Sequence, residues 1–178
     1  MRRLPLTPHI DGVLEKSQEL SVILKRNGVD LDLFFHCFLS DLSLSCSSIF
    51  KKVHVDPKDW LKESRNFLSK KRENKNVTKI IKTDVRKLLS AASAIAEENF
   101  ELDYIPPEVI LMVFFDKSHS PKVIKKLYPN KNKKADATVL GFITECSLAV
   151  KDFDFEEFNS PLEQEPETPD HWIDMFDK

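Results

Sequence analysis

The side chains that could perform chemistry are scattered along this sequence. The five histidines include no pair at the spacing that places two metal ligands on one helix face. The three cysteines fall in apolar helical patterns without a C-x-x-C spacing, which predicts buried free thiols. No Ser/His/Asp or Cys/His set and no distinctive carboxylate pair has local support. We therefore expect no metal site, no cofactor and no enzymatic activity. The residues concerned are His9, His36, His54, His119, His171, Cys37, Cys46 and Cys146.

Glycine content excludes two nucleotide-binding motifs. The chain has only Gly12, Gly28 and Gly141, so it contains neither a P-loop nor a dinucleotide-binding fingerprint. No apolar run approaches the roughly 18 to 20 residues that a membrane helix needs, and the start of the chain lacks the apolar stretch of a signal peptide. We expect a soluble, cytoplasmic protein with no membrane partner.

The elements that must position any site are helices. Apolar residues recur at i, i+3, i+4 and i+7, which predicts an all-α fold of eight helices. Thr7-Pro8 predicts the start of the first helix and Asn27-Gly28 its end. Asp32 is expected to cap the second helix, 33–39. The other six helices are expected near 45–53, after Asp56-Pro57, and at 85–98, 108–115, 123–128 and 135–150.

A weak internal repeat links the two halves of the chain. Residues from about 7 to 70 and from about 83 to 151 carry the same pattern at an offset of 75. Such self-similarity predicts two units that share one core. The matching pairs are Ile10 and Val85, Val13 and Leu88, Leu14 and Leu89, Leu20 and Ile95, Phe35 and Ile110, Leu39 and Phe114, Asp41 and Asp116, Ile49 and Ile124, and Phe67 and Phe142.

The repeat divides the sequence into four predicted parts. The first repeat is 6–70, and the second is 83–151. Between them, the lysine-rich stretch 71–82 lacks apolar periodicity, which predicts a solvated linker. The last part, 152–178, has the acidic and proline-containing composition of a flexible tail.

One segment resembles a known family. The run Tyr104-Ile105-Pro106-Pro107-Glu108, followed by the apolar residues 109–114, resembles the signature of the Clp N-terminal repeat. Residues 29–39 are similar but more diverged, and the pair covers about 6–151. The resemblance implies two pseudo-symmetric four-helix repeats packed as one domain, as in the N domains of Clp/Hsp100 AAA+ unfoldases. It also implies recruitment of a protein or peptide partner, such as a substrate or adaptor, without catalysis.

The same resemblance suggests where a partner binds. Glu108 stands at the signature glutamate of the second repeat, and Leu33 is expected to replace it in the first. Phe34 and Phe115 are the apolar residues chosen to line a surface groove. Because no ATPase region follows in the sequence, we expect either a fragment of an unfoldase or a free-standing relative, and the acidic tail favours the second. A diverged binding surface is expected on the first repeat and the tail.

Two other partner classes arise from the charge pattern. The basic stretches 70–75 and 122–134 suggest phosphate contacts, but aromatic residues are not interleaved with the lysines, so nucleic acid is not favoured. Apolar residues at the end of an acidic tail are typical of a docking motif. The run Trp172-Ile173-Asp174-Met175-Phe176-Asp177 resembles the C-terminal sliding-clamp-binding peptides of T4-type phage replication and late-transcription proteins. The resemblance implies the alternative function, which is a phage-type replication or late-transcription accessory protein. Its tail would bind a sliding clamp and its helical body polymerase or DNA. The tail residues concerned are Trp172, Ile173, Met175 and Phe176.

Overall fold

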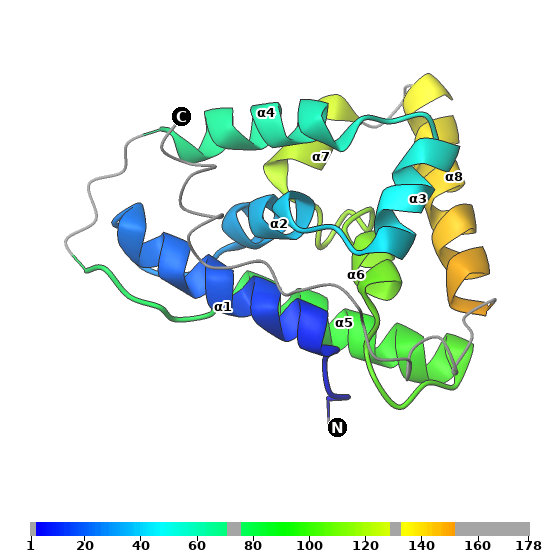
Figure 1. The fold of residues 1–178 in the computed structure, drawn as a ribbon, viewed down its shortest axis with the longest axis horizontal. Coiled ribbons are helices and arrows are strands. Elements are labelled where there is room, and N and C mark those ends of the chain that lie inside the picture. Colours follow the sequence, from blue (N-terminus) through cyan, green and yellow to red (C-terminus); the bar gives the residue numbers. More distant parts are fainter. Residues whose placement is uncertain (1–2, 71–75, 129–132, 152–178) are drawn as a thin grey trace.

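All helices and strands that the structure describes are of one type, the α-helix. The computed structural model describes residues 3–70, 76–128 and 133–151. Eight α-helices lie within these ranges, which confirms the predicted all-α class, and the only β-type pairing there is two isolated bridges. The helices, shown in Figure 1, are α1 (Pro8–Ile23), α2 (Leu31–Ser40), α3 (Leu44–Lys52), α4 (Pro57–Leu68), α5 (Thr83–Phe100), α6 (Pro107–Val113), α7 (Lys122–Leu127) and α8 (Lys133–Lys151).

Local capping sets where the early helices begin. Proline follows Thr7 at the first position of α1, where its missing N–H removes no helical bond. Asp30 caps α2 by accepting a hydrogen bond from the backbone N–H of Leu33 at 2.9 Å. The prediction that Asp32 caps this helix is therefore wrong by two residues. Helix α1 also ends earlier than expected, because Lys25 at φ 54° already turns the chain ahead of Gly28.

Two short backbone pairings relate the halves of the molecule by an internal twofold. The N–H of Val29 donates to the carbonyl of Ile80 at 2.7 Å, and the N–H of Ile105 donates to that of Pro5 at 2.8 Å. In both pairings, the segment before the first helix of one half runs beside the segment before the second helix of the other half. Helix packing follows the same relation, since α3 contacts α8 and α4 contacts α7.

The offset between equivalent residues changes from 75 to 76 near the end of the first helix of each half. The carbonyls of Ser21 and Ala96, 75 apart, each accept the backbone bond that closes the helix. The left-handed residues that follow, Lys25 and Glu101, are 76 apart. Helix α5 therefore carries one extra residue at its end. As a consequence, Asp32, not Leu33, occupies the position equivalent to Glu108, so the expected loss of the carboxylate in the first half is wrong.

The core is centred on aromatic side chains from both halves. Phe38 and Phe114 are equivalent at the offset of 76, and their ring centroids lie 5.3 Å apart. Such a contact between equivalent residues places them beside the internal twofold. Phe114 also meets the ring of Phe35 edge-on at 4.9 Å. A second cluster joins Trp60 of α4 to Phe142 of α8 at 5.2 Å. Both clusters connect the halves, so neither half buries its apolar surface alone.

The stretch between the halves is only partly what its composition predicts. Residues 71–75 lie outside the described residues, but 78–82 are held against the first half. Thr78 donates its backbone N–H to the carbonyl of Arg26 at 3.0 Å, and Lys82 donates to that of Val29 at 2.9 Å. This second part is therefore an ordered segment beside α1 (Figure 1), although Lys79 and Ile80 remain exposed to solvent.

None of the described helices is by itself both long and apolar enough to cross a bilayer. Helices α2 and α3 pass a length and composition test as a pair, but they are bent by 92° relative to each other. Side chains of α2 from Leu33 to Leu39 are all buried in the core, which accounts for the apolar composition.

Candidate protein-binding surface

The two phenylalanines chosen from the sequence do not line an open groove. Phe34 is 0% exposed and packs against Phe114 with ring centroids 5.9 Å apart. Phe115 is 8% exposed and stacks on Phe142 at 4.9 Å. Both predictions are wrong, because α2 packs against α1 and α4 while α6 packs against α5 and α8. A helix that is apolar on every face is buried on every face when it sits at the centre of a bundle. Neither ring offers a surface to a peptide.

Glu108 is also enclosed. Its residue is 5% exposed at the start of α6, near Cys46 of α3 and Cys146 of α8. Burial, with the Glu108 carboxylate as a further cause, raises the pKa of both thiols well above the ordinary value. Cys37 is likewise a buried free thiol, as the sequence predicts, and burial raises its pKa to about 12. These thiols are therefore poor nucleophiles in the folded protein.

The remaining predicted site residues, Trp172, Ile173, Met175 and Phe176, lie outside the described residues. Within the described ranges, no group of three His, Cys, Asp or Glu side chains is placed to hold a metal ion.

A different surface combines exposed apolar side chains with unpaired cations. We call it the α1–α5 patch. Its apolar members come from the end of α1 and from the segment beside it: Val22, Ile23, Leu24, Val77 and Ile80, of which Ile23 and Ile80 are each 57% exposed. Hydrogen bonds fix the two segments side by side. Ser21 donates its hydroxyl to the carbonyl of Thr78 at 2.8 Å, and Gln18 donates its amide to that of Lys79 at 2.9 Å.

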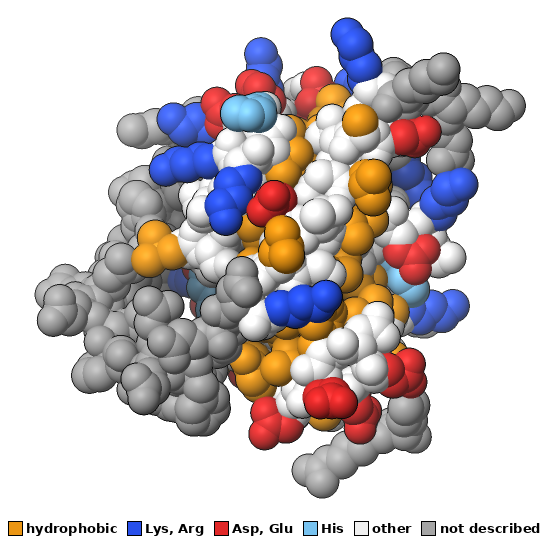
Figure 2. Space-filling model, turned by 90° about the vertical axis from the view of Figure 1, so that its right-hand side faces the viewer, with side chains coloured by type: hydrophobic (Ala, Val, Ile, Leu, Met, Phe, Trp, Pro, Cys, Tyr) orange, Lys and Arg blue, Asp and Glu red, His pale blue; other side chains and the backbone are white. Residues whose placement is uncertain are grey.

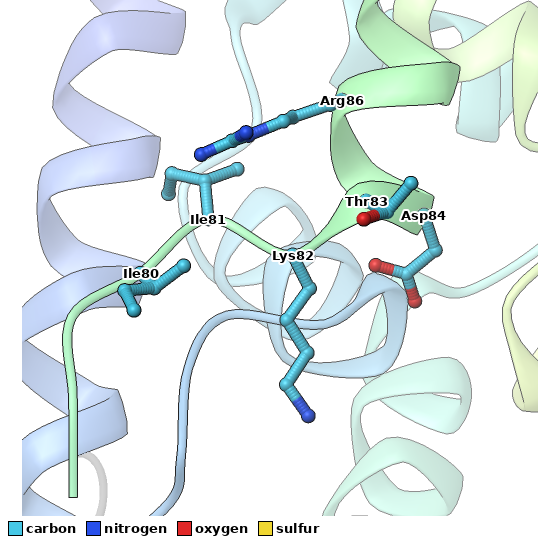
Figure 3. A pocket seen from close by; sticks show the side chains of 6 residues that line it. All are labelled: Ile80, Ile81, Lys82, Thr83, Asp84 and Arg86. Carbon is cyan, nitrogen blue, oxygen red and sulfur yellow. The ribbon is translucent and has the colours of Figure 1, made fainter.

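A hollow of about 430 Å³ adjoins these apolar residues at the start of α5. Figure 3 shows its lining, in which Arg86 reaches from α5 across Ile81 toward α1, and Lys82 leaves the chain on the other side. The carboxylate in this lining, Asp84, accepts a hydrogen bond from the N–H of Leu31 at 3.1 Å. It is therefore already engaged with the backbone.

The cations of the α1–α5 patch have no acidic partner among the described residues. Five ion pairs form within residues 3–70, 76–128 and 133–151, and none involves the patch cations. These cations are Lys25, Lys79, Lys82 and Arg86. Cationic side chains beside exposed apolar groups are chemically complementary to a segment that carries both acidic and apolar residues.

The internal twofold provides a control for this patch. The place of Val22-Ile23-Leu24 at the end of α1 is taken by residues 97–100 at the end of α5, where Glu97 and Glu98 are exposed. Arg86 in the first turn of α5 is matched by Asp11 in that of α1, at the offset of 75. Val22, Ile23 and Arg86 on one side are thus replaced by acidic residues on the other. The fold alone requires neither composition.

A second, smaller set of exposed apolar residues lies on α3 and α8. Leu44 is 72% exposed, Leu140 64% and Leu148 46%. Figure 2 views this side of the molecule, where hydrophobic side chains form a stripe above a group of acidic ones. These leucines line neither the hollow at the start of α5 nor the one between α4 and Tyr128, and single exposed leucines are common on protein surfaces.

Sequence reasoning missed the α1–α5 patch because its apolar residues look like core. Val22, Ile23 and Leu24 form an apolar run at the end of α1, but Val22 and Ile23 lie off the buried face of this helix and are exposed. The available signal was the repeat itself, since Glu97 and Glu98 stand at the positions of the second copy that match Val22 and Ile23.

Comparison with known proteins supports the fold. No family model matches the chain, and no curated protein matches its sequence. A chain from a solved structure described as "Coevolution of the ATPase ClpV, the TssB-TssC Sheath and the Accessory HsiE Protein Distinguishes Two Type VI Secretion Classes" has a similar fold. The TM-score is 0.59 at 14% sequence identity, and the match covers 89% of this chain and 91% of that one. At this identity the likeness shows a similar helical fold and nothing about activity.

Proposed function

We propose that this protein is a non-catalytic protein-binding domain, similar to the N domains of Clp/Hsp100 unfoldases, which recruits a partner through the α1–α5 patch. The observation that supports it is the difference between equivalent positions: Ile23 and Arg86 on one side, glutamate and Asp11 on the other. Exposed apolar residues weaken solubility, and neighbouring cations repel each other. Because the fold accepts acidic residues at the equivalent positions, the apolar and basic residues of the patch are not required for folding, which indicates a binding role.

The patch selects the chemistry of the partner. Val22, Ile23 and Ile80 offer apolar contact area, and Lys82 and Arg86 offer charge at the rim of the hollow. A partner segment with alternating acidic and large apolar residues satisfies both. The guanidinium group of Arg86 has two parallel N–H donors that suit a carboxylate of the partner. This geometry would fix the orientation of the partner as well as attract its charge.

Binding of two synthetic peptides to the full chain tests the proposal. Both peptides carry the same large apolar residues, alternating with aspartate in one and with lysine in the other. We expect the acidic peptide to bind, and the Ile23→Glu/Ile80→Glu variant to lower its affinity at least tenfold. The matched control is Leu140→Glu/Leu148→Glu, which makes the same change on α8. Equal loss in both variants, or preference for the basic peptide, would overturn the proposal.

A further inference from the structure

The sequence itself contains a segment with the chemistry that the α1–α5 patch selects. Residues 152–178 hold ten acidic residues and one lysine, a net charge of −9. The other 151 residues hold 26 lysines and arginines and 19 acidic residues, a net charge of +7. The chain is therefore close to neutral only because two strongly and oppositely charged parts offset each other.

The most apolar stretch of this acidic part is at 170–177. Trp172, Ile173, Met175 and Phe176 alternate there with Asp170, Asp174 and Asp177. Large apolar residues in an otherwise acidic segment match the α1–α5 patch in both respects: Ile23 and Ile80 supply apolar contact, and the four patch cations supply charge.

We propose that the α1–α5 patch binds segment 170–177 of the same chain. This rests on the proposed function, because the segment would then occupy the surface that recruits the partner and would compete with it. Direct competition makes the affinity for the partner depend on release of the segment, and salt weakens both complexes because both use the same cations.

Chain length permits this contact. Twenty residues separate Lys151 at the end of α8 from Trp172. Fully extended, such a segment spans up to about 70 Å. A compact body of this size has a radius of gyration of about 15 Å, so the segment reaches any point on its surface. Intramolecular contact of this kind benefits from a high effective concentration, typically in the millimolar range for short flexible connections.

Paramagnetic relaxation in the full chain tests the proposal. Thr168→Cys provides a nitroxide site next to the segment, and labelling is selective because Cys37, Cys46 and Cys146 are buried. We expect strong loss of the amide signals of Ile23 and Ile80, whereas the signals of Glu97 and Glu98 at the equivalent end of α5 stay intact. Equal loss on both sides, or none on the patch, would overturn the proposal. Loss that appears only when labelled and unlabelled chains are mixed would assign the segment to a second copy instead.

Charge reversal identifies the cause of any contact. Lys82→Glu/Arg86→Glu is expected to reduce the relaxation effect at Ile23 and Ile80 at least fivefold. Both substitutions place carboxylates at the start of α5, where the helix dipole favours them, so the fold is retained. Lys51→Glu/Lys58→Glu, an equal charge change at exposed positions elsewhere, should leave the effect unchanged. Equal reduction in both variants would show attraction by overall charge without a site and would also overturn the proposal.

A last measurement separates the failure of this proposal from that of the proposed function. The full-length Trp172→Ser/Phe176→Ser variant is titrated with the acidic peptide described above. If the segment occupies the patch, this variant binds the peptide at least threefold more tightly than the natural chain. Unchanged and saturable binding would reject the segment as the occupant while keeping the patch as a binding surface. No binding to either chain would reject the patch itself.

Discussion

Asp32 of α2 caps helix α7 in the opposite half of the molecule. Its Oδ1 accepts a hydrogen bond from the backbone N–H of Lys122 at 2.8 Å, and the Lys122 ammonium lies 3.9 Å from Oδ2. Pro121, the residue directly before α7, has no side chain able to cap it. The sequence predicts that Asp32 caps α2, but its carboxylate caps the start of α7, ninety residues further along the chain.

Removal of this cap should destabilise the protein. We expect Asp32→Ala to lower the free energy of unfolding by about 1 to 2 kcal/mol, since it leaves an unpaired N–H at the start of α7. Asp32→Asn keeps an acceptor oxygen and should cost less than half as much, because burial already raises the pKa of this carboxyl and so disfavours its charged form. Urea unfolding of the three chains measures the difference. Equal stability of all three would contradict the capping role.

The buried histidine should make stability depend on pH. His36 is 0% exposed and shares a hydrogen bond with the hydroxyl of Ser64 at 2.9 Å. Burial, with the charge of Arg65 as a second cause, lowers the pKa of His36 to about 4, against 6.5 for an ordinary histidine. Between these values the unfolded chain binds more protons than the folded one. The contribution of this residue is therefore full above about pH 6.5 and declines as the pH falls toward 4.

Equilibrium unfolding at pH 7 and pH 5 measures this decline. The stability lost between the two pH values should be about 2 kcal/mol greater in the natural chain than in His36→Gln, which cannot take up a proton. An equal loss in both chains would show that other groups cause the pH dependence.

Gly28 holds a conformation that a side chain would strain. Its φ is +146°, and a Cβ atom would lie 2.7 Å from the carbonyl oxygen of Ile80, the acceptor in the Val29 pairing. We expect Gly28→Ala to cost about 1 to 3 kcal/mol. Gly12 in α1 is the matched control, because a Cβ there meets nothing within 4 Å. Gly12→Ala should raise stability by about 0.5 to 1 kcal/mol. Thermal unfolding compares the pair, and effects of the same sign would refute the assigned geometry.

Phe114 should be among the side chains that contribute most to stability. It is fully buried and contacts rings of α2 beside the internal twofold. We expect Phe114→Ala to cost about 3 to 5 kcal/mol, from lost burial and from the cavity that remains. Leu140→Ala, at an exposed position on α8, should change stability by less than about 0.5 kcal/mol. Denaturant unfolding followed by fluorescence provides both values, and comparable losses would argue against a shared aromatic core.

The sequence determined the class of fold because helix periodicity and end signals are local properties. The apolar spacing of α1 and α5 and the prolines that open α1, α4 and α6 are all readable from neighbouring residues. The repeat was also visible in the sequence, but its register was not, because the extra residue of α5 makes Phe38 equivalent to Phe114 in place of Leu39. The burial of the three cysteines followed from the same spacing.

Contacts between the halves were decided only by the tertiary structure. Phe34 was expected at a groove and lies in the core, because its ring packs on Phe114 of the opposite half, far away in the sequence. Asp32 caps α7 for the same reason. The α1–α5 patch arises because hydrogen bonds hold Thr78 and Lys79 beside the end of α1, where Ile23 is left exposed. A sequence pattern shows which residues are apolar, whereas only the packed chain shows which of them no neighbour covers.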